Sequence, residues 1–479
     1  MRGMRWHAGL RHSSGALPER YGLWLALLAM VLAALTSGCG KTTASTSPEA
    51  PARVRTVRFW QPFGGEHGKA MHEIVAEFNR THPTIHVEIS FAANNLSASQ
   101  KLFLAIAGGE APDVTMVDGQ QLAEWAARGA LTDITSQVER AGLTGDDFFL
   151  PRWNESVFRN RVYALPWGAD PNFAFCWNKK AFREAGLDPE RPPRTIAELD
   201  EYNQKLTRFD ANGRLIQIGL LPWPYGVDNA MFTWGYAFGG EFYRPSADAL
   251  SPGQVTANDP HNVAALRWLR SFGQKYDVRK LNAFQSSFVG LANDPFRLGS
   301  QTMCLLHVQQ VQDIKRYAPT LEYGIGLIPA PPDGEYPNGW VGGWSMAVPR
   351  GALASDEAFE FMRWMCTSPE GTMKLGKEMG QFPACRKSLY YQSIKGNRDL
   401  EVFYEVLKGA RHVRTLMPAQ GYLMELLRRG ADEVLYGGRD PQAVLDEITI
   451  KAQHRLEYVM ARANDRTDNR TVETGDAAP

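Results

Sequence analysis

Residues 59–89, "FWQPFGGEHGKAMHEIVAEFNRTHPTIHVEI", place a strand, a loop, a helix and a second strand in direct succession. The first strand is predicted from Val54, over "VRTVRFW", and the second alternates apolar and polar residues after Pro83. Between them, four apolar residues recur at the spacing of one helical face: Met71, Ile74, Val75 and Phe78. This succession predicts an α/β fold.

The alternation of strands and helices continues beyond this unit. "APDVTMVD" is a short apolar run that ends at Asp118, and "QQLAEWAARGAL" after it has helical composition. Later helices begin with side-chain caps: a capping box at Thr195 and Glu198, and cap residues followed by proline at Asp259, Ser368 and Asp440. No repeat of about 20 to 50 residues is visible, which argues against a solenoid or a propeller.

Length and charge narrow the class of protein. A chain of 479 residues is too long for one compact core and indicates two or three domains, or one intertwined pair of lobes. The formal net charge is zero, and residues 1–38 carry four arginines against one glutamate, so the remainder is net negative. A near-neutral body without a basic block argues against nucleic-acid binding.

The N-terminus has the pattern of an export signal. A basic region up to Arg20 precedes the apolar run Leu23 to Leu35, which is shorter than the roughly 20 residues that span a bilayer. The following "TSGC" resembles the bacterial lipobox, in which the cysteine is lipidated, although Thr36 stands where leucine is usual. We predict a signal peptide at 1–38 and lipidation at Cys39; ordinary signal cleavage nearby is the alternative.

Two polar segments flank the folded body. Residues 39–53 are rich in Ser, Thr, Ala and Pro, and residues 461–479 are similarly polar. Neither segment holds enough apolar surface to offset its ordering entropy. We therefore predict a flexible tether at 39–53 and a disordered tail at 461–479, with the body held outside the cell membrane or in the periplasm by a lipid anchor only.

Further phrases follow the opening stretch in a fixed order: "AIAGGEAPDVTMVD", "ARGALTDIT", "YALPWGADPNFAFCWNKKAFREAGLDPERPPRTIAELDEY", "GYAFGGEFY", "VGGWSMAVP", and "FMRWMCTSPEG" with "GQFPACRKSL". Together they resemble the bacterial extracellular solute-binding proteins, family 1, of ABC importers, over Val54 to Val459. The phrases "FW…GEHGK" and "GLDPERPPRT" are most similar to the branch that includes glycerol-3-phosphate and sugar binders.

The resemblance implies a two-lobed, hinge-closing fold with several crossings of the chain between lobes. We expect lobe 1 at 54–168 and 319–365, and lobe 2 at 169–318 and 366–460. A ligand held in the cleft contacts both lobes and favours the closed state, which a membrane permease recognises. The resemblance implies no cofactor and no bond cleavage, and we expect a monomer.

Aromatic candidates come from residues at strand ends. A sugar presents apolar faces and a rim of hydroxyls, and clefts of α/β lobes form at the carboxyl ends of strands. The tryptophans at such positions are Trp60, Trp167, Trp223, Trp340 and Trp344. The alternative for each is a buried packing residue. Gly343, in "VGGWSMAVP", lacks a side chain and would let a ligand approach the backbone.

Polar candidates come from the same loops: Glu66, Asp118, Asp170, His307 and Arg386. Carboxylates accept strong, charge-assisted hydrogen bonds from hydroxyls. Three of these residues have alternatives: a turn cap for Asp170, plain packing for His307, and a surface ion pair for Arg386.

Four cysteines remain after Cys39. Cys366 ends one helix and Cys385 follows the next, so an antiparallel return would bring them together as a disulfide. Cys176 and Cys304 both follow apolar runs and are either bridged or free. No cysteine or histidine spacing indicates a metal site.

The sequence favours the substrate-binding component of an ABC importer with a neutral sugar or oligosaccharide as ligand, because the chosen loops offer more carboxylates and tryptophans than cations. A binder of glycerol-3-phosphate or a related phosphodiester is one alternative. An exported glycoside hydrolase that uses Glu66 and Asp170 is another.

Overall fold

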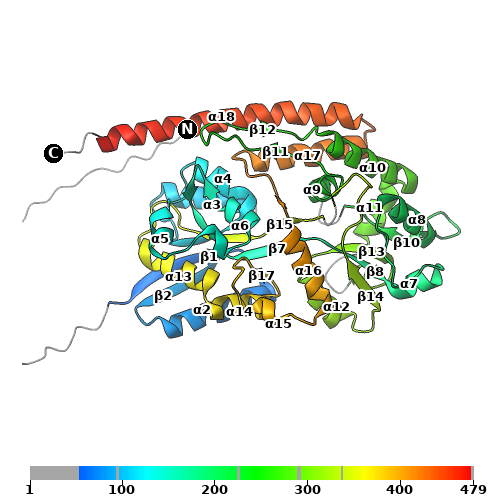
Figure 1. Cartoon of the computed structure of the whole chain (residues 1–479), viewed down its shortest axis with the longest axis horizontal. Coiled ribbons are helices and arrows are strands. Elements are labelled where there is room, and N and C mark those ends of the chain that lie inside the picture. The colour runs from blue at the N-terminus through cyan, green and yellow to red at the C-terminus, as the bar shows by residue number, and fades with distance from the viewer. Residues whose placement is uncertain (1–52, 93–95, 224–226, 289–292, 336–337, 476–479) are drawn as a thin grey trace, which may run out of the picture. The chain divides into compact units, whose positions relative to one another are not determined.

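The computed structural model describes residues 53–92, 96–223, 227–288, 293–335 and 338–475. These residues belong to one compact unit, Arg53–Pro479 (Figure 1). The predicted signal peptide, the lipidation site at Cys39 and all of the predicted tether except Arg53 lie outside the described residues. Within the described ranges, every helix is too short or too polar to cross a membrane.

The first of two large sheets has the strand order β2-β1-β3-β16-β6. Its strands are β1 (Arg55–Gln61), β2 (Ile85–Phe91), β3 (Val114–Asp118), β6 (Ala164–Pro166) and β16 (Trp344–Ala347). β1 runs parallel to β2 and β3, and β16 runs antiparallel to β3 and β6. Helix α2 (Gly65–Thr81) joins β1 to β2 and buries the predicted apolar face. The predicted strand, helix and strand are confirmed. The helix provides the long crossover connection that two parallel strands require.

Five further helices belong to this lobe: α3 (Leu96–Ala107), α4 (Gly119–Ala127), α5 (Thr135–Arg140), α13 (Ser355–Thr367) and α14 (Pro369–Met379). α14 packs on both α2 and α13. Residues of α14 were expected in lobe 2, because the predicted boundary lay at 366. That boundary is wrong: Leu375 and Met379 belong to the core of the first lobe.

The second sheet has the order β14-β8-β13-β10-β9. Its strands are β8 (Ala174–Asn178), β9 (Arg208–Phe209), β10 (Leu215–Leu220), β13 (Gln301–Leu306) and β14 (Tyr323–Gly326). β14 pairs with β8, so residues 323–326 lie in the second lobe and not in the first, where we had expected 319–365. The reason is that the chain makes one more strand of the second sheet before it crosses back.

Helices surround the second sheet: α7 (Lys179–Glu184), α8 (Ile196–Leu206), α9 (Val227–Ala237), α10 (Pro260–Tyr276), α11 (Val278–Ser286), α12 (Gln310–Tyr317), α17 (Gln420–Leu435) and α18 (Pro441–Gly475). The predicted cap residues are confirmed: Thr195, Asp259, Ser368 and Asp440 each accept a hydrogen bond from a backbone N–H in the first turn of a helix. The other half of the predicted capping box differs, because the Glu198 carboxylate accepts from the backbone N–H of Arg194, at 2.8 Å.

A smaller sheet connects the two lobes, in the order β17-β7-β15-β18. Its strands are β7 (Gly168–Asn172), β15 (Trp340–Gly342), β17 (Phe382–Pro383) and β18 (His412–Val413). β7 follows β6 of the first sheet and leads to β8 of the second, while β15 leads to β16 of the first. Figure 1 shows β7, β15 and β17 between the two lobes. This crossing sheet is where the chain passes from lobe to lobe.

Short elements complete the fold: α6 (Leu150–Glu155), α15 (Tyr390–Ser393), α16 (Arg398–Gly409), a 3₁₀ turn at Gly145–Asp147, and the hairpins β4 (Val157–Phe158) with β5 (Arg161–Val162) and β11 (Tyr243–Arg244) with β12 (Gln254–Val255). α6 and α16 lie against the crossing sheet.

Helix α18 contradicts the predicted disordered tail, because residues 461–475 continue this helix. α18 packs on α17 and α10 of the second lobe and also contacts α4 of the first (Figure 1). Arg159, in the turn of the β4–β5 hairpin, donates hydrogen bonds to the carbonyls of Ala463, at 3.1 Å, and Met460, at 3.4 Å. These contacts order the start of the segment that composition alone assigns to a free tail.

The four cysteines of the described structure are free, buried thiols. The predicted bridge between Cys366 and Cys385 is therefore wrong; Cys366 instead lies within the apolar core of the first lobe, where its thiol contacts the carbonyl of Leu165. Cys176 and Cys304 stand directly opposite each other on β8 and β13, and the free alternative holds for both.

Candidate functional site

Asp118 stands at the carboxyl end of β3 and caps the N-terminus of α4, where it accepts hydrogen bonds from the backbone and the side chain of Gln120. It also forms an ion pair with Arg414, at 3.5 Å, and both side chains are largely but not fully buried. Arg414 directly follows β18 of the crossing sheet. The pair therefore ties the first lobe to the crossing segment.

Trp340 contacts the same arginine through the face of its ring. The Arg414 guanidinium lies 4.8 Å from the centre of the Trp340 ring, a cation–π contact. The indole N–H of Trp340 donates to the hydroxyl of Thr233 on α9, at 3.1 Å, and the residue is 1% exposed. Trp340 is thus a core residue that positions Arg414.

Asp170 lies on β7, opposite Gly342 of β15, so the predicted alternative of a turn cap is wrong. Its Oδ1 is buried and has no hydrogen-bond partner among the described residues. Burial raises the pKa of Asp170 to about 6, although the positive charge of Arg152 opposes the shift. A carboxyl group with an unused buried oxygen is a ready acceptor for a ligand hydroxyl.

Arg152 of α6 is fully buried, and its charge interacts with that of Asp170. Its guanidinium donates to the carbonyl of Gly168 and to the hydroxyl of Ser345, each at 3.0 Å, and pairs with Glu155. Burial lowers its pKa to about 10, and the charges of Asp170 and Asp118 oppose that shift. Arg152 therefore stays cationic at neutral pH, and its charge offsets those of Asp170 and Asp118.

Trp344 begins β16 directly opposite Asp118, and its side chain is partly exposed. The ring of Phe63, from the loop between β1 and α2, lies 5.5 Å from the Trp344 ring and 5.7 Å from the ring of fully buried Trp167. We call Asp118, Asp170, Trp340, Trp344 and Arg414 the junction cluster. It combines an aromatic face with acceptors and one cation.

Gly343 joins β15 to β16 within this cluster. Its φ is +136°, a conformation that side-chain-bearing residues rarely adopt, and a Cβ there would collide with the carbonyl of Gly168. The fold itself thus requires glycine at 343, whereas we had assigned this requirement to a ligand.

His307 follows β13 and lies near the cluster. Its ring centre is 4.5 Å from that of Phe173, and burial together with the charge of Arg414 lowers its pKa to about 3. The imidazole is therefore neutral at physiological pH and partly exposed.

The remaining predicted residues fall outside the cluster. Trp223 is 4% exposed and packs against Phe272 in the second lobe. Trp167 and Trp340 are also buried, so the packing alternative is confirmed for all three tryptophans. Trp60 is partly exposed beneath Lys101. Glu66 is exposed in the first turn of α2, where Lys69 lowers its pKa. Arg386 is exposed and lines a separate cavity.

Sequence reasoning missed Arg414, Arg152 and Phe63. Phe63 lies in "QPFGG", the loop between a predicted strand and helix, and the rule that selected Trp60 there would also have selected it. Arg414 carries no such signal: it follows a two-residue strand and meets Asp118 across 296 positions of sequence. The described residues hold no group of three or more potential metal-ligating side chains.

Comparison with known proteins gives one family. The family model described as bacterial extracellular solute-binding protein matches residues 64–373. The chain is 27% identical over 314 residues to the sn-glycerol-3-phosphate-binding periplasmic protein UgpB of Shigella flexneri, covering 62% of this chain and 67% of that protein. It is 26% identical over 314 residues to the protein of the same name from Escherichia coli K12, with the same coverage.

Solved structures share the fold. CpMnBP1 with mannotriose bound aligns with a TM-score of 0.72 at 25% identity, covering 84% of this chain and 100% of that one. The GacH receptor of Streptomyces glaucescens, solved without ligand and with acarbose, aligns with a TM-score of 0.68 at 20% identity, covering 84% and 98%. The predicted two-lobed α/β fold is confirmed.

Proposed function

The chain belongs to the bacterial extracellular solute-binding proteins, and we propose that it is the component of an ABC importer that captures a carbohydrate between its lobes and delivers it to a membrane permease. The junction cluster is the observation that supports a carbohydrate as the ligand. Partly exposed Trp344 stands beside Asp118 and near Asp170, so one flat apolar ring and two carboxylates meet where the lobes join.

The chemistry of a sugar matches this arrangement. Its C–H face stacks on an indole, and its rim hydroxyls donate to carboxylate oxygens in strong, charge-assisted bonds. Arg414 donates to ring or hydroxyl oxygens from the crossing segment. Because Trp344 and Asp118 belong to the first lobe, and His307 to the second, a ligand that contacts both sets stabilises the closed arrangement.

Export and anchoring complete the proposal. A signal peptide at 1–38 directs the chain out of the cytoplasm, and lipidation of Cys39 holds it at the outer face of the membrane as a monomer. The protein binds its ligand without turnover and needs no cofactor.

A second candidate ligand is glycerol-3-phosphate or a related phosphodiester. Arg414, which the sequence did not reveal, favours it, as do the printed names of the UgpB relatives. Against it, Arg414 is the one cation of the junction cluster, and a phosphate beside it would face the negative charges of Asp118 and Asp170. An anion site needs several free donors that converge, so the neutral sugar remains the better match.

A glycoside hydrolase is the third candidate, and Glu66 argues against it. A general acid needs a raised pKa, whereas the Lys69 ion pair lowers the pKa of Glu66 and the side chain is exposed.

Calorimetry on the chain without residues 1–38 separates the three candidates. Mannobiose, mannotriose, maltose and sn-glycerol-3-phosphate are titrated in turn, and each mixture is then analysed for products. We expect a mannose- or glucose-based oligosaccharide to bind, with no product. If sn-glycerol-3-phosphate binds more tightly than every sugar, the phosphate ester becomes the proposed ligand. Release of a monosaccharide would overturn the binding-protein proposal.

A further inference from the structure

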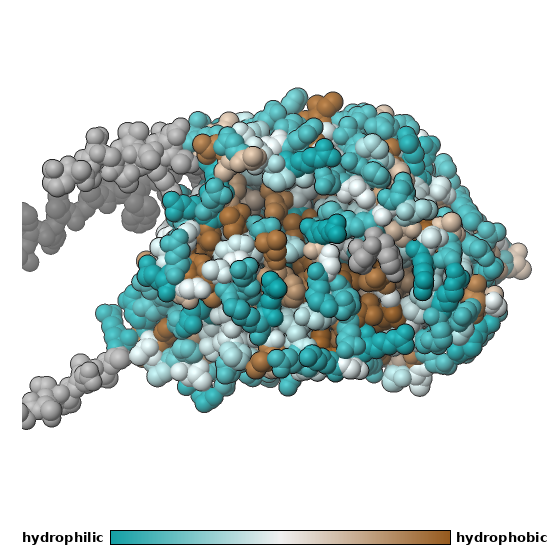
Figure 2. Space-filling view, viewed as in Figure 1, coloured by the Kyte–Doolittle hydropathy of each residue, from teal (hydrophilic) through white to brown (hydrophobic). Residues whose placement is uncertain are grey.

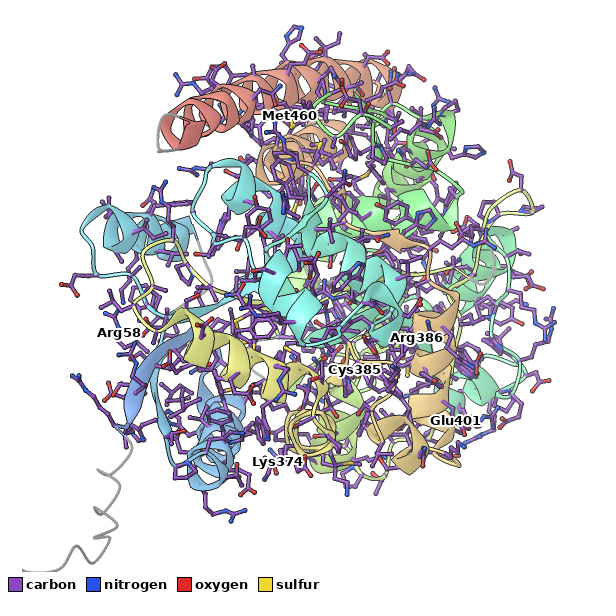
Figure 3. The ribbon with its side chains drawn as sticks, turned by 60° about the vertical axis from the view of Figure 1, so that its left-hand side comes forward. Arg58, Lys374, Cys385, Arg386, Glu401 and Met460 are labelled. Carbon is purple, nitrogen blue, oxygen red and sulfur yellow. The ribbon has the colours of Figure 1, made fainter. Side chains whose placement is uncertain are left out.

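A cavity of about 790 Å³ is lined by residues outside the junction cluster. Its walls come from α6, from the loop after β17, from α16 and from the segment that follows α16. Arg386, in the loop after β17, lies next to α16 in Figure 3. We call this space the basic cavity. Its size is that of pockets that enclose small organic ligands.

The floor of the basic cavity is apolar. Phe149 and Leu407 are buried members of one core cluster, and Leu150 stands at the edge with 62% of its surface exposed. Val413 and Leu416 continue the apolar lining from the segment after α16. Figure 2, in the same view as Figure 1, shows apolar side chains near the centre of the face on which α6 and α16 lie, surrounded by hydrophilic ones. Exposed apolar surface of this kind favours a ligand with an apolar body.

The rim of the basic cavity is positively charged. Arg386, Lys387, Lys408 and Arg411 line it, against the single carboxylate of Asp146. The two lysines are engaged: Lys387 pairs with Asp147, and Lys408 pairs with Glu405 and lies over the Tyr404 ring.

The two arginines are not engaged. Among the residues that the structure describes, neither the Arg386 nor the Arg411 guanidinium makes an ion pair or a side-chain hydrogen bond. Both side chains are exposed. The backbone N–H of Arg386 donates to the carbonyl of Asp147, at 2.9 Å, so the loop is positioned without help from its guanidinium. Two guanidinium groups with unused, forked donors match a carboxylate, sulfonate or phosphate.

We propose that the basic cavity is a second ligand site, which takes a small amphipathic organic anion. The apolar body of the ligand packs on Phe149, Leu150 and Leu407, and its anionic group accepts hydrogen bonds from Arg386 and Arg411. This site does not depend on the carbohydrate proposal, because none of its residues belongs to the junction cluster.

The position of the basic cavity links it to the junction cluster. Val413 lines the cavity, and the next residue, Arg414, contacts Asp118 and Trp340. An occupant of the basic cavity therefore packs against the segment that supplies the cation of the junction cluster.

The test compares two fluorescent probes with the same aromatic body. 8-Anilinonaphthalene-1-sulfonate carries a sulfonate, and N-phenyl-1-naphthylamine lacks it. We expect the sulfonate probe to bind the full exported chain at least about tenfold more tightly than the neutral probe, and added salt to remove most of that difference. In the double variant R386Q/R411Q the sulfonate probe should lose about tenfold in affinity while the neutral probe is unaffected.

Another cavity, distinct from the basic cavity, supplies the matched control. It has a volume of about 720 Å³ and is lined by Arg214 and Lys280, so R214Q/K280Q removes the same number of cations elsewhere. Equal affinity for both probes in the unaltered chain, or equal losses in the two double variants, would overturn the proposal. If R386Q/R411Q does not fold, Leu150→Glu places a carboxylate at the rim and removes apolar surface, so it should weaken both probes but the sulfonate probe more. Equal losses for the two probes, or no loss, in that variant would overturn the proposal.

Discussion

Trp340 and Trp344 stand four positions apart in one short stretch, yet they belong to different regions of the molecule. Trp340 lies on the crossing sheet, reaches into the second lobe to bond Thr233, and is 1% exposed. Trp344 begins a strand of the first sheet, packs on Phe63 and keeps part of its ring exposed. The comparison teaches that residue type and spacing select candidates for a ligand platform, and that the lobe to which each strand belongs decides between them.

The largest expected effect separates the two by stability. Trp340→Ala should lower the free energy of unfolding by about 3 to 5 kcal/mol, because it empties a buried site, and it also leaves the Thr233 hydroxyl without this donor. Trp344→Ala should lower it by about 1 kcal/mol or less, as expected for a partly exposed side chain. Urea denaturation of both variants without ligand checks this, and similar losses would break the comparison.

The next effect concerns Asp170, which stands opposite Gly342 between the two tryptophans. Since its pKa in the folded state, about 6, lies above the ordinary carboxyl value, its contribution to stability is greatest at low pH and is lost as the pH rises through 6. Asp170→Asn should therefore gain stability relative to the unaltered protein by up to about 3 kcal/mol on going from pH 4 to pH 7.5. Denaturation curves at the two pH values measure this, and an unchanged difference would contradict the raised pKa.

The third effect is on ligand affinity, for which Trp344 and not Trp340 is the important tryptophan. Trp344→Ala should raise the dissociation constant of the bound sugar about 10- to 100-fold, because the stacking face is lost. Trp60→Ala is the control, since Trp60 is also partly exposed but lies beneath Lys101, outside the junction cluster. Calorimetry at fixed pH measures both, and the platform assignment fails if Trp60→Ala costs as much.

The smallest effect tests the residue that joins the two regions. Arg414 lies over Trp340 and pairs with Asp118, which stands opposite Trp344. A double-mutant cycle with Asp118→Asn and Arg414→Gln should give a coupling energy of about 1 kcal/mol in the unliganded protein, as for a partly exposed pair. A coupling energy near zero would mean that the two regions are energetically independent.

Much of the fold follows from local sequence. The strand, helix and strand at residues 59–89 and the caps at Thr195 and Asp259 rest on patterns within a few tens of residues. The expected order of the lobes along the chain rests instead on the family resemblance. The errors arise where a local pattern does not identify the segment that an element pairs with. Nothing in the sequence of β14 indicates that it belongs to the second sheet. Nothing in the polar residues after 461 indicates that Arg159 binds their backbone.

The candidate site was less predictable for the same reason. Asp118 and Asp170 follow from their place at or near strand ends, but burial separates Trp344 from Trp340 and Trp223, and burial is decided by packing from distant segments. Arg414 enters only because β18 pairs beside β15. The disulfide prediction failed similarly, since two helices in succession do not fix which faces carry the cysteines.

The contact of Arg159 with the carboxyl-terminal part of α18 has a mechanical consequence. From Pro441 to Ala463 the helix is about 33 Å long at its usual rise, so a swing of about 10° at its beginning would carry Ala463 through roughly 6 Å. A hydrogen bond tolerates only a few tenths of an ångström. The β4–β5 hairpin contacts α4 and α5 of the first lobe, whereas α18 packs on the second. The hydrogen bonds of Arg159 therefore oppose a rotation of the second lobe away from the first, and they must break before the lobes separate by this much.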